Sequence, residues 1–239
     1  MFLEPTGERV IEEHYLKSAS SYLIYLFHKA TYRFAREFSV GKHVLDYGCG
    51  SGYGTHYLAP YSTSITGIDI ASDAIEYAQK HYQAPNLHYA CVKPANEVPL
   101  PFSDASFDTV LSFQVIEHVA NPKPYLSEIL RILKPGGVFV CATPDRTTRL
   151  LSNQKPWNMW HCCEYDITSL RTILSSHFQD VSLYRMGGKK EMLAPEMRRT
   201  QRLAWLTLPV TLPFVPERIR IAALRILKIF SRPAGTGQQ

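Results

Sequence analysis

From residue 43 to residue 143, the hydrophobic and polar positions alternate between two patterns. Short runs rich in β-branched and aromatic residues predict strands, and segments with the apolar spacing of amphipathic helices lie between them. The predicted strands are 43–47, 64–70, 86–92, 107–113 and 137–143, and the predicted helices are 53–58, 72–81 and 124–133. Strands that alternate with helices in this way build a parallel sheet with helices on both faces. We therefore predict an α/β, doubly wound fold.

The regions outside this alternation have other patterns. Residues 1–40 are rich in Tyr and Phe at helical spacing and predict an N-terminal helical cap, which either packs on the sheet or closes as a lid over a ligand. We assign residues 41–186 to the central domain and expect one further strand at 181–185. Residues 187–239 form a basic, amphipathic C-terminal extension with an expected helix at 216–230.

Composition narrows the function classes. Apolar residues make up 45% of the chain, which is typical of a globular protein with a buried core. The net charge is +5, and most of the basic excess follows residue 185. A solvated basic tail explains this excess more simply than a nucleic-acid site does. No apolar run reaches the ~20 residues that span a bilayer, and the acidic N-terminus does not resemble a secretory signal. We expect a cytoplasmic protein, with peripheral contact at the inner membrane face left open.

The cysteines bear on redox compartment and on metal binding. The five cysteines contain no C-x-x-C pair, which favours free thiols in a reducing compartment. Cys162 and Cys163 follow His161, but adjacent cysteines rarely bind one ion, and we expect no metal on this evidence.

A glycine-rich turn joins the first predicted strand to the first predicted helix. Gly48, Gly50 and Gly52 allow backbone N–H groups to approach a ligand closely, and Asp69 follows the second strand at a distance suited to binding a ribose. This combination indicates a cofactor that contains a nucleoside. Asp46, beside the turn, would repel a pyrophosphate but would attract an ammonium or sulfonium group. The site therefore favours S-adenosylmethionine over a dinucleotide.

Four segments carry a resemblance to a known family: 44–52, 67–70, 107–119 and 133–137. In this order and spacing they resemble the class I S-adenosylmethionine-dependent methyltransferases, in particular the methyltransferase-domain 11-like members that act on small molecules and glycans. The resemblance covers about residues 40–145. It implies a Rossmann-like, mostly parallel sheet of seven strands and S-adenosylmethionine as the cofactor.

The resemblance also implies which residues meet the cofactor. The glycine turn would pass under the methionine part, Asp69 would accept hydrogen bonds from the ribose hydroxyls, and Ile70 would pack on the adenine. Asn96 would accept from the adenine amino group. Gln114 would lie where the sulfonium meets the acceptor, and Tyr32 would close over the carboxylate end. The full set expected at the cofactor is Asp46, Gly48, Cys49, Gly50, Gly52, Asp69, Ile70, Asn96, Gln114 and Tyr32.

Methylation of a hydroxyl also needs a base, because the acceptor loses its proton as the new bond forms. The candidates are His118, His161 and Glu164. His118 follows the fourth strand, and its neighbour Glu117 could orient it. His161 lies after the fifth strand, where substrate loops of this fold stand above the carboxyl ends. A structural role remains open for both histidines: His118 at the first turn of a helix, and His161 bonded to loop backbone.

The acceptor is less constrained by the sequence. The segments 7–9, 28–32, 143–145 and 160–165 look like those of bacterial members found with polysaccharide and glycolipid assembly genes. Trp157 and Trp160 have flat apolar faces of the kind that stack on sugar rings or aromatic acceptors, and packing within the loop is the alternative. We therefore expect O-methylation of a sugar, glycolipid or other small-molecule hydroxyl, with a prenylated quinone or lipid-derived phenol as the alternative.

Three other functions compete with this one. They are a nucleotide-dependent dehydrogenase, a non-catalytic binding module on the same fold, and a nucleic-acid methyltransferase. The last lacks a base-flipping motif, and we expect no nucleic acid as partner. The expected partner is a small-molecule or glycan acceptor. The C-terminal extension would contact a membrane surface, form a dimer contact or cover the protein's own sheet.

Overall fold

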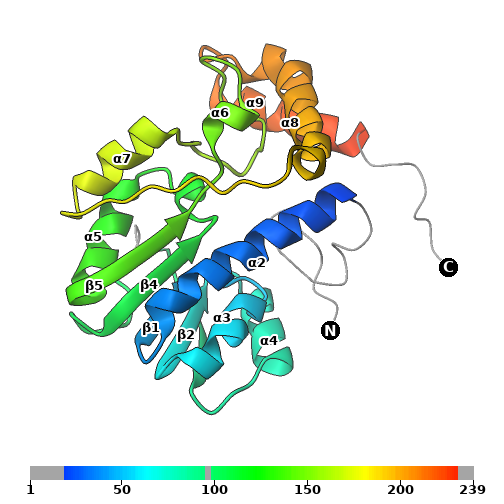
Figure 1. Ribbon diagram of the computed structural model, residues 1–239. Coiled ribbons are helices and arrows are strands. Elements are labelled where there is room, and N and C mark those ends of the chain that lie inside the picture. The colour runs from blue at the N-terminus through cyan, green and yellow to red at the C-terminus, as the bar shows by residue number, and fades with distance from the viewer. Residues whose placement is uncertain (1–18, 95–97, 231–239) are drawn as a thin grey trace.

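The computed structural model describes residues 19–94 and 98–230 (Figure 1). Its strands are β1 (His43–Tyr47), β2 (Ser64–Asp69), β3 (Leu87–Cys91), β4 (Phe107–Phe113) and β5 (Leu133–Ala142). Its α-helices are α2 (Ala19–Ser39), α3 (Tyr53–Leu58), α4 (Ser72–His81), α5 (Pro122–Ile132), α6 (Arg146–Arg149), α7 (Ile167–Ser175), α8 (Lys190–Thr211) and α9 (Glu217–Phe230). Two short 3-10 turns are η1 (Ala59–Tyr61) and η2 (Ile116–His118). The predicted alternation of strands and helices is confirmed.

The sheet is parallel, and its strand order is β3-β2-β1-β4-β5. The chain builds outward from β1 to β3 and then crosses to the other side of β1 to add β4 and β5. This reversal places the carboxyl ends of β1 and β4 side by side, with Asp46 paired to Leu111. In open α/β sheets, ligands bind in the crevice beyond the carboxyl ends at such a reversal.

The expectation of seven strands is wrong for the described residues, which contain five. The segment 181–185, predicted as a strand, makes no ladder hydrogen bonds. Its alternating apolar pattern has another cause, because Val181 and Leu183 pack against the core without a partner strand. Period-two alternation reports which side chains are buried and does not by itself require a neighbouring strand.

Helices cover both faces of the sheet, and each face has its own core. On one face, alternate residues such as Leu45 and Val110 pack with α5 and α7. On the other face, Val44 and Leu111 pack with α2 and α3. The side-chain period of two sends adjacent residues of one strand into different cores. The sheet is therefore held rigidly between two apolar layers, and the loops at its carboxyl edge are left to form a site.

Two local features differ from the expected boundaries. Strand β5 begins at Leu133, which pairs with Phe107, and the register then shifts so that Thr109 pairs with Val138. Gly136, with φ of 75°, lies within this irregularity. Helix α8 continues through Pro195 and Pro209, although proline in a helix interior removes a backbone hydrogen bond and usually kinks or breaks the helix.

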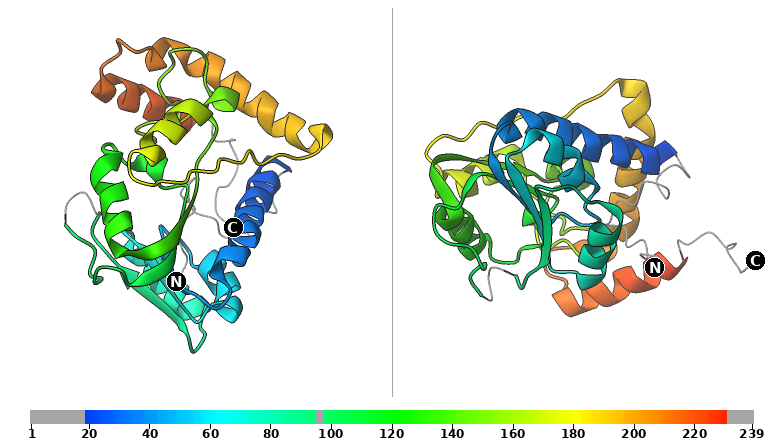
Figure 2. Two further views of the ribbon diagram at one scale, coloured as in Figure 1. Left: turned by 60° about the vertical axis from the view of Figure 1, so that its left-hand side comes forward. Right: turned by 90° about the horizontal axis from the view of Figure 1, so that it is seen from below.

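The C-terminal helices form a layer beyond the carboxyl edge of the sheet. Figure 1 shows the arrowheads of β4 and β5 pointing toward α6, α8 and α9, and the left view of Figure 2 shows the same layer above the sheet. Helix α8 contacts α2, α6 and α9. The two terminal regions of the chain therefore meet at the edge where the site lies. Within the described residues, no helix has both the length and the apolar character needed to cross a bilayer.

Candidate active site

The glycine turn between β1 and α3 combines tight packing with an open backbone. Gly48, Gly50 and Gly52 all have positive φ, at 85°, 54° and 84°. A Cβ on Gly48 would lie 2.3 Å from Cγ2 of Val115, and one on Gly52 would lie 2.6 Å from Cβ of Ala78. A Cβ on Gly50 would have no heavy atom within 4 Å. The two ends of the turn therefore pack against Val115 and Ala78. Its centre, at Gly50, is open, and a ligand can approach the backbone there.

Asp46, the fourth residue of β1, is a fully buried carboxylate below this turn. Its Oδ2 accepts hydrogen bonds from the Tyr32 hydroxyl at 3.0 Å and the Thr55 hydroxyl at 2.6 Å. Its Oδ1 has no hydrogen-bond partner among the described residues. Burial raises the pKa of Asp46 to about 6, against the two hydrogen bonds, which lower it. A cationic group beside Oδ1 would satisfy this oxygen, and S-adenosylmethionine carries two such groups.

Tyr32, on α2, reaches the site through Asp46. Its side chain is buried, its ring makes edge contacts with Tyr53 and Phe113, and its hydroxyl bonds to Asp46. A Cβ on Gly54 would lie 2.0 Å from the Tyr32 ring, so helix α3 rests directly on it. Tyr32 therefore supports the glycine turn through Asp46, and its expected contact with the cofactor carboxylate stays a prediction.

Asp69, the last residue of β2, is held by two backbone amides. Gly50 N donates to Oδ2 and Ala71 N donates to Oδ1, each at 2.9 Å. A carboxylate has about four acceptor positions, so each oxygen keeps one for a ribose hydroxyl. Ile70 is 60% exposed beside it and can cover a flat ring. Cys49, in contrast, is buried and points away from solvent. Asn96 lies outside the described residues.

Gln114 follows β4 with a strained backbone, because its φ of 58° lies in the left-handed region that non-glycine residues rarely adopt. Its N–H donates to the Ala142 carbonyl at 2.7 Å and ties the end of β4 to the end of β5. The next residue, Val115, packs on Gly48. Gln114 therefore lies between the glycine turn and the histidine-bearing loops.

His161 belongs to a buried cluster of polar side chains. Its Nδ1 donates to Oε1 of Glu164 at 2.8 Å, and Arg149 Nε donates to Oε2 of the same carboxylate at 3.0 Å. Burial opposes ionisation of Glu164, but the hydrogen bonds and charges of His161 and Arg149 bring its pKa below the ordinary value. Arg149 also lies over the Trp157 ring at 4.4 Å. Glu164 therefore orients His161, and its own oxygens are already engaged.

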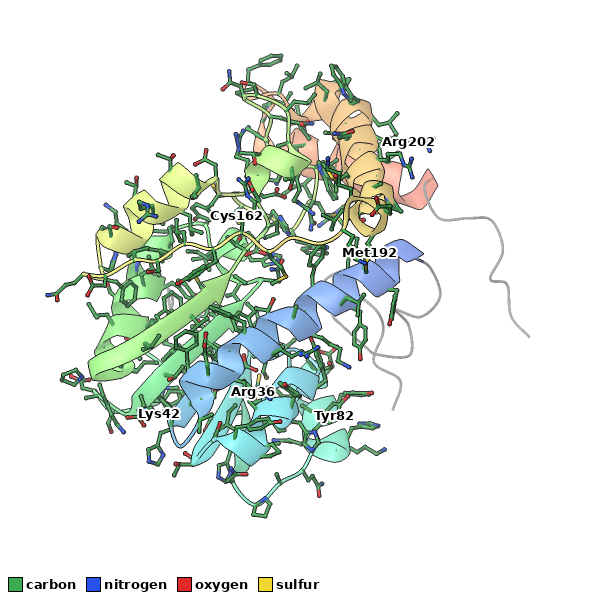
Figure 3. All side chains as sticks on the ribbon, viewed as in Figure 1. Arg36, Lys42, Tyr82, Cys162, Met192 and Arg202 are labelled. Atoms are coloured by element: carbon green, nitrogen blue, oxygen red, sulfur yellow. The ribbon has the colours of Figure 1, made fainter. Side chains whose placement is uncertain are left out.

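His118 lies against His161, although 43 positions separate them in the sequence. Their rings are perpendicular, with centroids 4.9 Å apart. His118 Nδ1 donates to the Trp160 carbonyl at 3.0 Å, and the amides of Cys162 and Cys163 donate to the Glu117 carbonyl. Figure 3 places Cys162 between the sheet and the C-terminal layer. The loop after β5 is thus bonded to η2, and both candidate bases lie at one place.

Glu117 is itself a functional candidate, beyond its predicted role of orienting His118. It is fully buried, its Oε2 accepts from the Thr143 hydroxyl at 2.9 Å, and its Oε1 has no hydrogen-bond partner among the described residues. Burial raises its pKa. The sequence signal was its position beside His118 at the end of a strand.

The C-terminal extension holds the loop that carries His161, which the sequence did not reveal. Arg220 of α9 is 2% exposed, and its guanidinium donates to the carbonyls of Pro156 and His161 and to Glu217. Gln154 is also buried and donates to the Ala204 carbonyl of α8 at 2.7 Å. An arginine in a basic amphipathic helix is normally expected to be exposed, so no sequence signal marked Arg220.

Comparisons of the sequence with known proteins identify a methyltransferase family that it resembles. Residues 45–141 match the family model described as a methyltransferase domain. A curated protein of Mycolicibacterium smegmatis, described as a probable S-adenosylmethionine-dependent methyltransferase, is 32% identical over 175 residues, which cover 72% of this chain and 63% of that protein. The chain thus spans less than two thirds of the length of this relative.

Two further proteins are similar. The ubiquinone biosynthesis O-methyltransferase of Maricaulis maris is 37% identical over 109 residues, which cover 46% of this chain and 43% of that enzyme. The structure of Haemonchus contortus phosphoethanolamine N-methyltransferase 2 in complex with S-adenosyl-L-methionine has a TM-score of 0.57 at 18% identity, over 84% of this chain and 49% of that one. The second likeness shows a shared fold.

Proposed function

Because the chain belongs to the class I S-adenosylmethionine-dependent methyltransferases, we propose that it transfers a methyl group to a hydroxyl of a sugar, a glycolipid or another small molecule. The observation that carries the proposal is the buried carboxylate of Asp46, whose Oδ1 is unsatisfied, at the same carboxyl edge of the sheet as the His118 and His161 pair. One group suits a cationic cofactor and the other suits proton removal from an acceptor.

The cofactor supplies an activated methyl group on a sulfonium. Asp46 would compensate the positive charge, and Asp69, held by the Gly50 and Ala71 amides, would receive the ribose. Ile70 would cover the adenine with its exposed side chain. These residues come from the ends of β1 and β2 and are fixed by the sheet. Holding the methyl group and the acceptor in line supplies most of the rate acceleration in such a displacement.

The acceptor proton is the second requirement. His161 donates its Nδ1 proton to Glu164, so the lone pair of the neutral ring is on Nε2. The acceptor hydroxyl would lose its proton as its oxygen bonds to the methyl carbon and the sulfur–carbon bond breaks. Glu164, ionised between His161 and Arg149, would stabilise the imidazolium formed at His161.

One exposed aromatic side chain, Trp160, supports a sugar as the acceptor. Trp160 is 50% exposed, and its backbone carbonyl accepts the hydrogen bond from His118 Nδ1. Trp157 does not offer its face in the same way, because Arg149 and Arg199 lie over its ring. Stacking of a sugar ring on Trp160 would place a hydroxyl near the histidine pair.

A lipid-derived phenol is the second candidate, and a surface of the C-terminal extension favours it. The buried stripe of α8 is small and polar, whereas its outer surface and that of α9 carry large apolar side chains. The exposed large apolar residues of this layer are Met192, Met197, Trp205, Leu206, Phe214, Ile219, Ile226 and Leu227. Arg202, which Figure 3 shows projecting outward from α8, and Arg218 are exposed among them. Such a surface suits contact with an anionic membrane that holds the acceptor.

An acceptor screen with methyl-labelled S-adenosylmethionine tests the proposal. Hexoses, glycolipids and phenols are offered separately to the wild-type protein, to His161→Ala and to His88→Ala, a control whose histidine is exposed on β3. We expect label in a sugar hydroxyl, a loss of roughly 10²–10⁴-fold in His161→Ala and no loss in the control. Label in phenols alone would favour the second candidate. Cofactor binding with no transfer to any acceptor would instead support a binding module.

A further inference from the structure

Three potential metal ligands converge at the carboxyl edge of β4 and β5. Glu117 and His118 belong to η2, and His161 belongs to the loop that follows β5. One ligand atom from each of the three residues lies within 4.8 Å of the others. The hydrogen bonds from Cys162 N and Cys163 N to the Glu117 carbonyl hold the two segments together. Two imidazoles and one carboxylate therefore meet without participation of the cysteines.

Both histidines are oriented by hydrogen bonds at Nδ1. His118 Nδ1 donates to the Trp160 carbonyl, and His161 Nδ1 donates to Glu164. An imidazole that donates from Nδ1 carries its lone pair on Nε2, the atom that binds a metal. Histidine ligands usually make such a bond to a carbonyl or a carboxylate, which fixes the ring and its tautomer. Arg149 extends the arrangement on the His161 side by holding Glu164.

Glu117 provides an independent observation. Its carboxylate is fully buried, Thr143 satisfies only Oε2, and Oε1 has no hydrogen-bond partner among the described residues. An unsatisfied buried carboxylate oxygen costs free energy, and a cation is the partner that removes this cost. The Thr143 bond also leaves Oε1 as the oxygen that can bind a cation.

We propose that Glu117 Oε1, His118 Nε2 and His161 Nε2 bind one divalent transition-metal ion, of which Zn²⁺ is the type that this ligand set suits best. Two imidazoles with one carboxylate form a three-ligand set that leaves a position open for a substrate. Bonds to such an ion are about 2.0–2.2 Å long, so binding draws the three side chains closer together. The sequence prediction of no metal rested on Cys162 and Cys163, because adjacent cysteines rarely bind one ion. Neither cysteine belongs to the proposed ligand set.

The role of the ion rests on the proposed function. The acceptor hydroxyl would occupy the open position, and the ion would lower its pKa. The O–H bond then breaks and its proton passes to solvent water. The oxygen lone pair forms the new O–CH₃ bond while the S–CH₃ bond breaks, and its electron pair stays on sulfur as a neutral thioether. With the ion bound, the Nε2 lone pair of His161 is engaged, so His161 holds the ion in place of acting as the general base, and solvent receives the proton.

Direct binding of Co²⁺ tests the site without any activity measurement. The chelator-treated protein is titrated with Co²⁺ and followed by visible absorption, which reports nitrogen and oxygen ligation. We expect one Co²⁺ per chain in the wild type and in the control His88→Ala, displacement by Zn²⁺, and loss of the absorption in His118→Ala and Glu117→Gln. Glu164→Gln should retain the site and weaken it by roughly 10–100-fold, because it acts through His161.

Two results would overturn the metal site: no absorption in the wild type, or an equal titration in wild type, His118→Ala and Glu117→Gln. Circular dichroism on each variant separates loss of ligand from loss of fold. Calorimetric binding of S-adenosylmethionine to the same samples keeps the two proposals apart. Cofactor binding without Co²⁺ binding rejects the metal site alone, and Co²⁺ binding without cofactor binding rejects the proposed function alone.

Discussion

The hydroxyl of Tyr32, on α2, donates a hydrogen bond of 3.0 Å to Oδ2 of Asp46, on β1. This bond joins the N-terminal helix to the carboxylate that lies under the glycine turn. Since the Thr55 hydroxyl occupies the same oxygen, Oδ1 is the atom that remains for a ligand. The N-terminal region therefore acts on the cofactor site through the position and charge of one carboxylate.

Tyr32→Phe removes this bond and keeps the ring packing. The change should raise the pKa of Asp46, since the hydrogen bond favours the charged form. We expect S-adenosylmethionine to bind more weakly by about 1–2 kcal/mol at neutral pH. Calorimetric titration measures this loss, and Tyr61→Phe on η1 serves as the matched control. Equal affinities of Tyr32→Phe and the wild type for S-adenosylmethionine would show that the Tyr32 hydroxyl does not contribute to cofactor binding.

The pKa of Asp46, raised by burial to about 6, predicts a pH dependence of cofactor binding. A cation prefers the ionised carboxylate, so affinity for S-adenosylmethionine should fall by up to about tenfold per pH unit below pH 6. Calorimetry between pH 5 and pH 7 gives the profile, and Asp46→Asn should flatten it. A wild-type profile that is already flat over this range would contradict the assigned role.

The same shift predicts the stability of the ligand-free protein. The folded pKa lies above the unfolded value of 3.8, so the unfolded state binds fewer protons between these two values. The contribution of Asp46 is therefore fully present below about pH 4 and is lost as pH rises through 6. Urea unfolding of wild type and Asp46→Asn should differ more at pH 7 than at pH 4. The reverse trend would show that the carboxylate is paired in the ligand-free state.

Gly50→Ala and Gly41→Ala form a matched pair. Both glycines have positive φ, at 54° and 67°, and a Cβ at either position would meet no heavy atom within 4 Å. Each substitution should therefore cost a similar backbone strain of about 1 kcal/mol. Only the methyl group at residue 50 would enter the space assigned to the cofactor. We expect cofactor affinity to fall in Gly50→Ala and to be retained in Gly41→Ala; equal affinities would place the cofactor elsewhere.

Arg220→Met tests whether the C-terminal extension positions the His161 loop. The change leaves the Pro156 and His161 carbonyls without their donor, and we expect a loss of about 1–3 kcal/mol in the free energy of unfolding. Methyl-transfer turnover should fall while cofactor affinity is retained, because Arg220 contacts only the acceptor side. The exposed neighbour Arg218→Met is the control. A variant that loses stability but keeps full turnover would limit Arg220 to a structural role.

The sequence predicted the cofactor half of the site better than the acceptor half. The positions of Gly48, Gly50, Gly52 and Asp69 follow from one local motif and one strand end, and β1, α3, α4 and β4 have the predicted bounds. The hydrogen bond from Tyr32 to Asp46 was not predicted, because it depends on how α2 crosses the sheet. Burial of this kind is a tertiary property that helical periodicity does not report.

The acceptor half depends on contacts between distant segments. The meeting of Glu117 with His161, and of Arg220 with the loop that carries His161, joins residues 44 and 59 positions apart. The strand predicted at 181–185 failed for a related reason, since its apolar residues are buried by packing without a partner strand. Local patterns indicate which side chains are buried, and the fold decides what they contact.

The most direct test of the central claim is calorimetric titration of the 239-residue chain with S-adenosylmethionine and, separately, with NADH. The account predicts binding of one S-adenosylmethionine per chain, no binding of NADH, and a loss of roughly 1–3 kcal/mol of binding free energy in Asp69→Ala. Binding of NADH without binding of S-adenosylmethionine would contradict it.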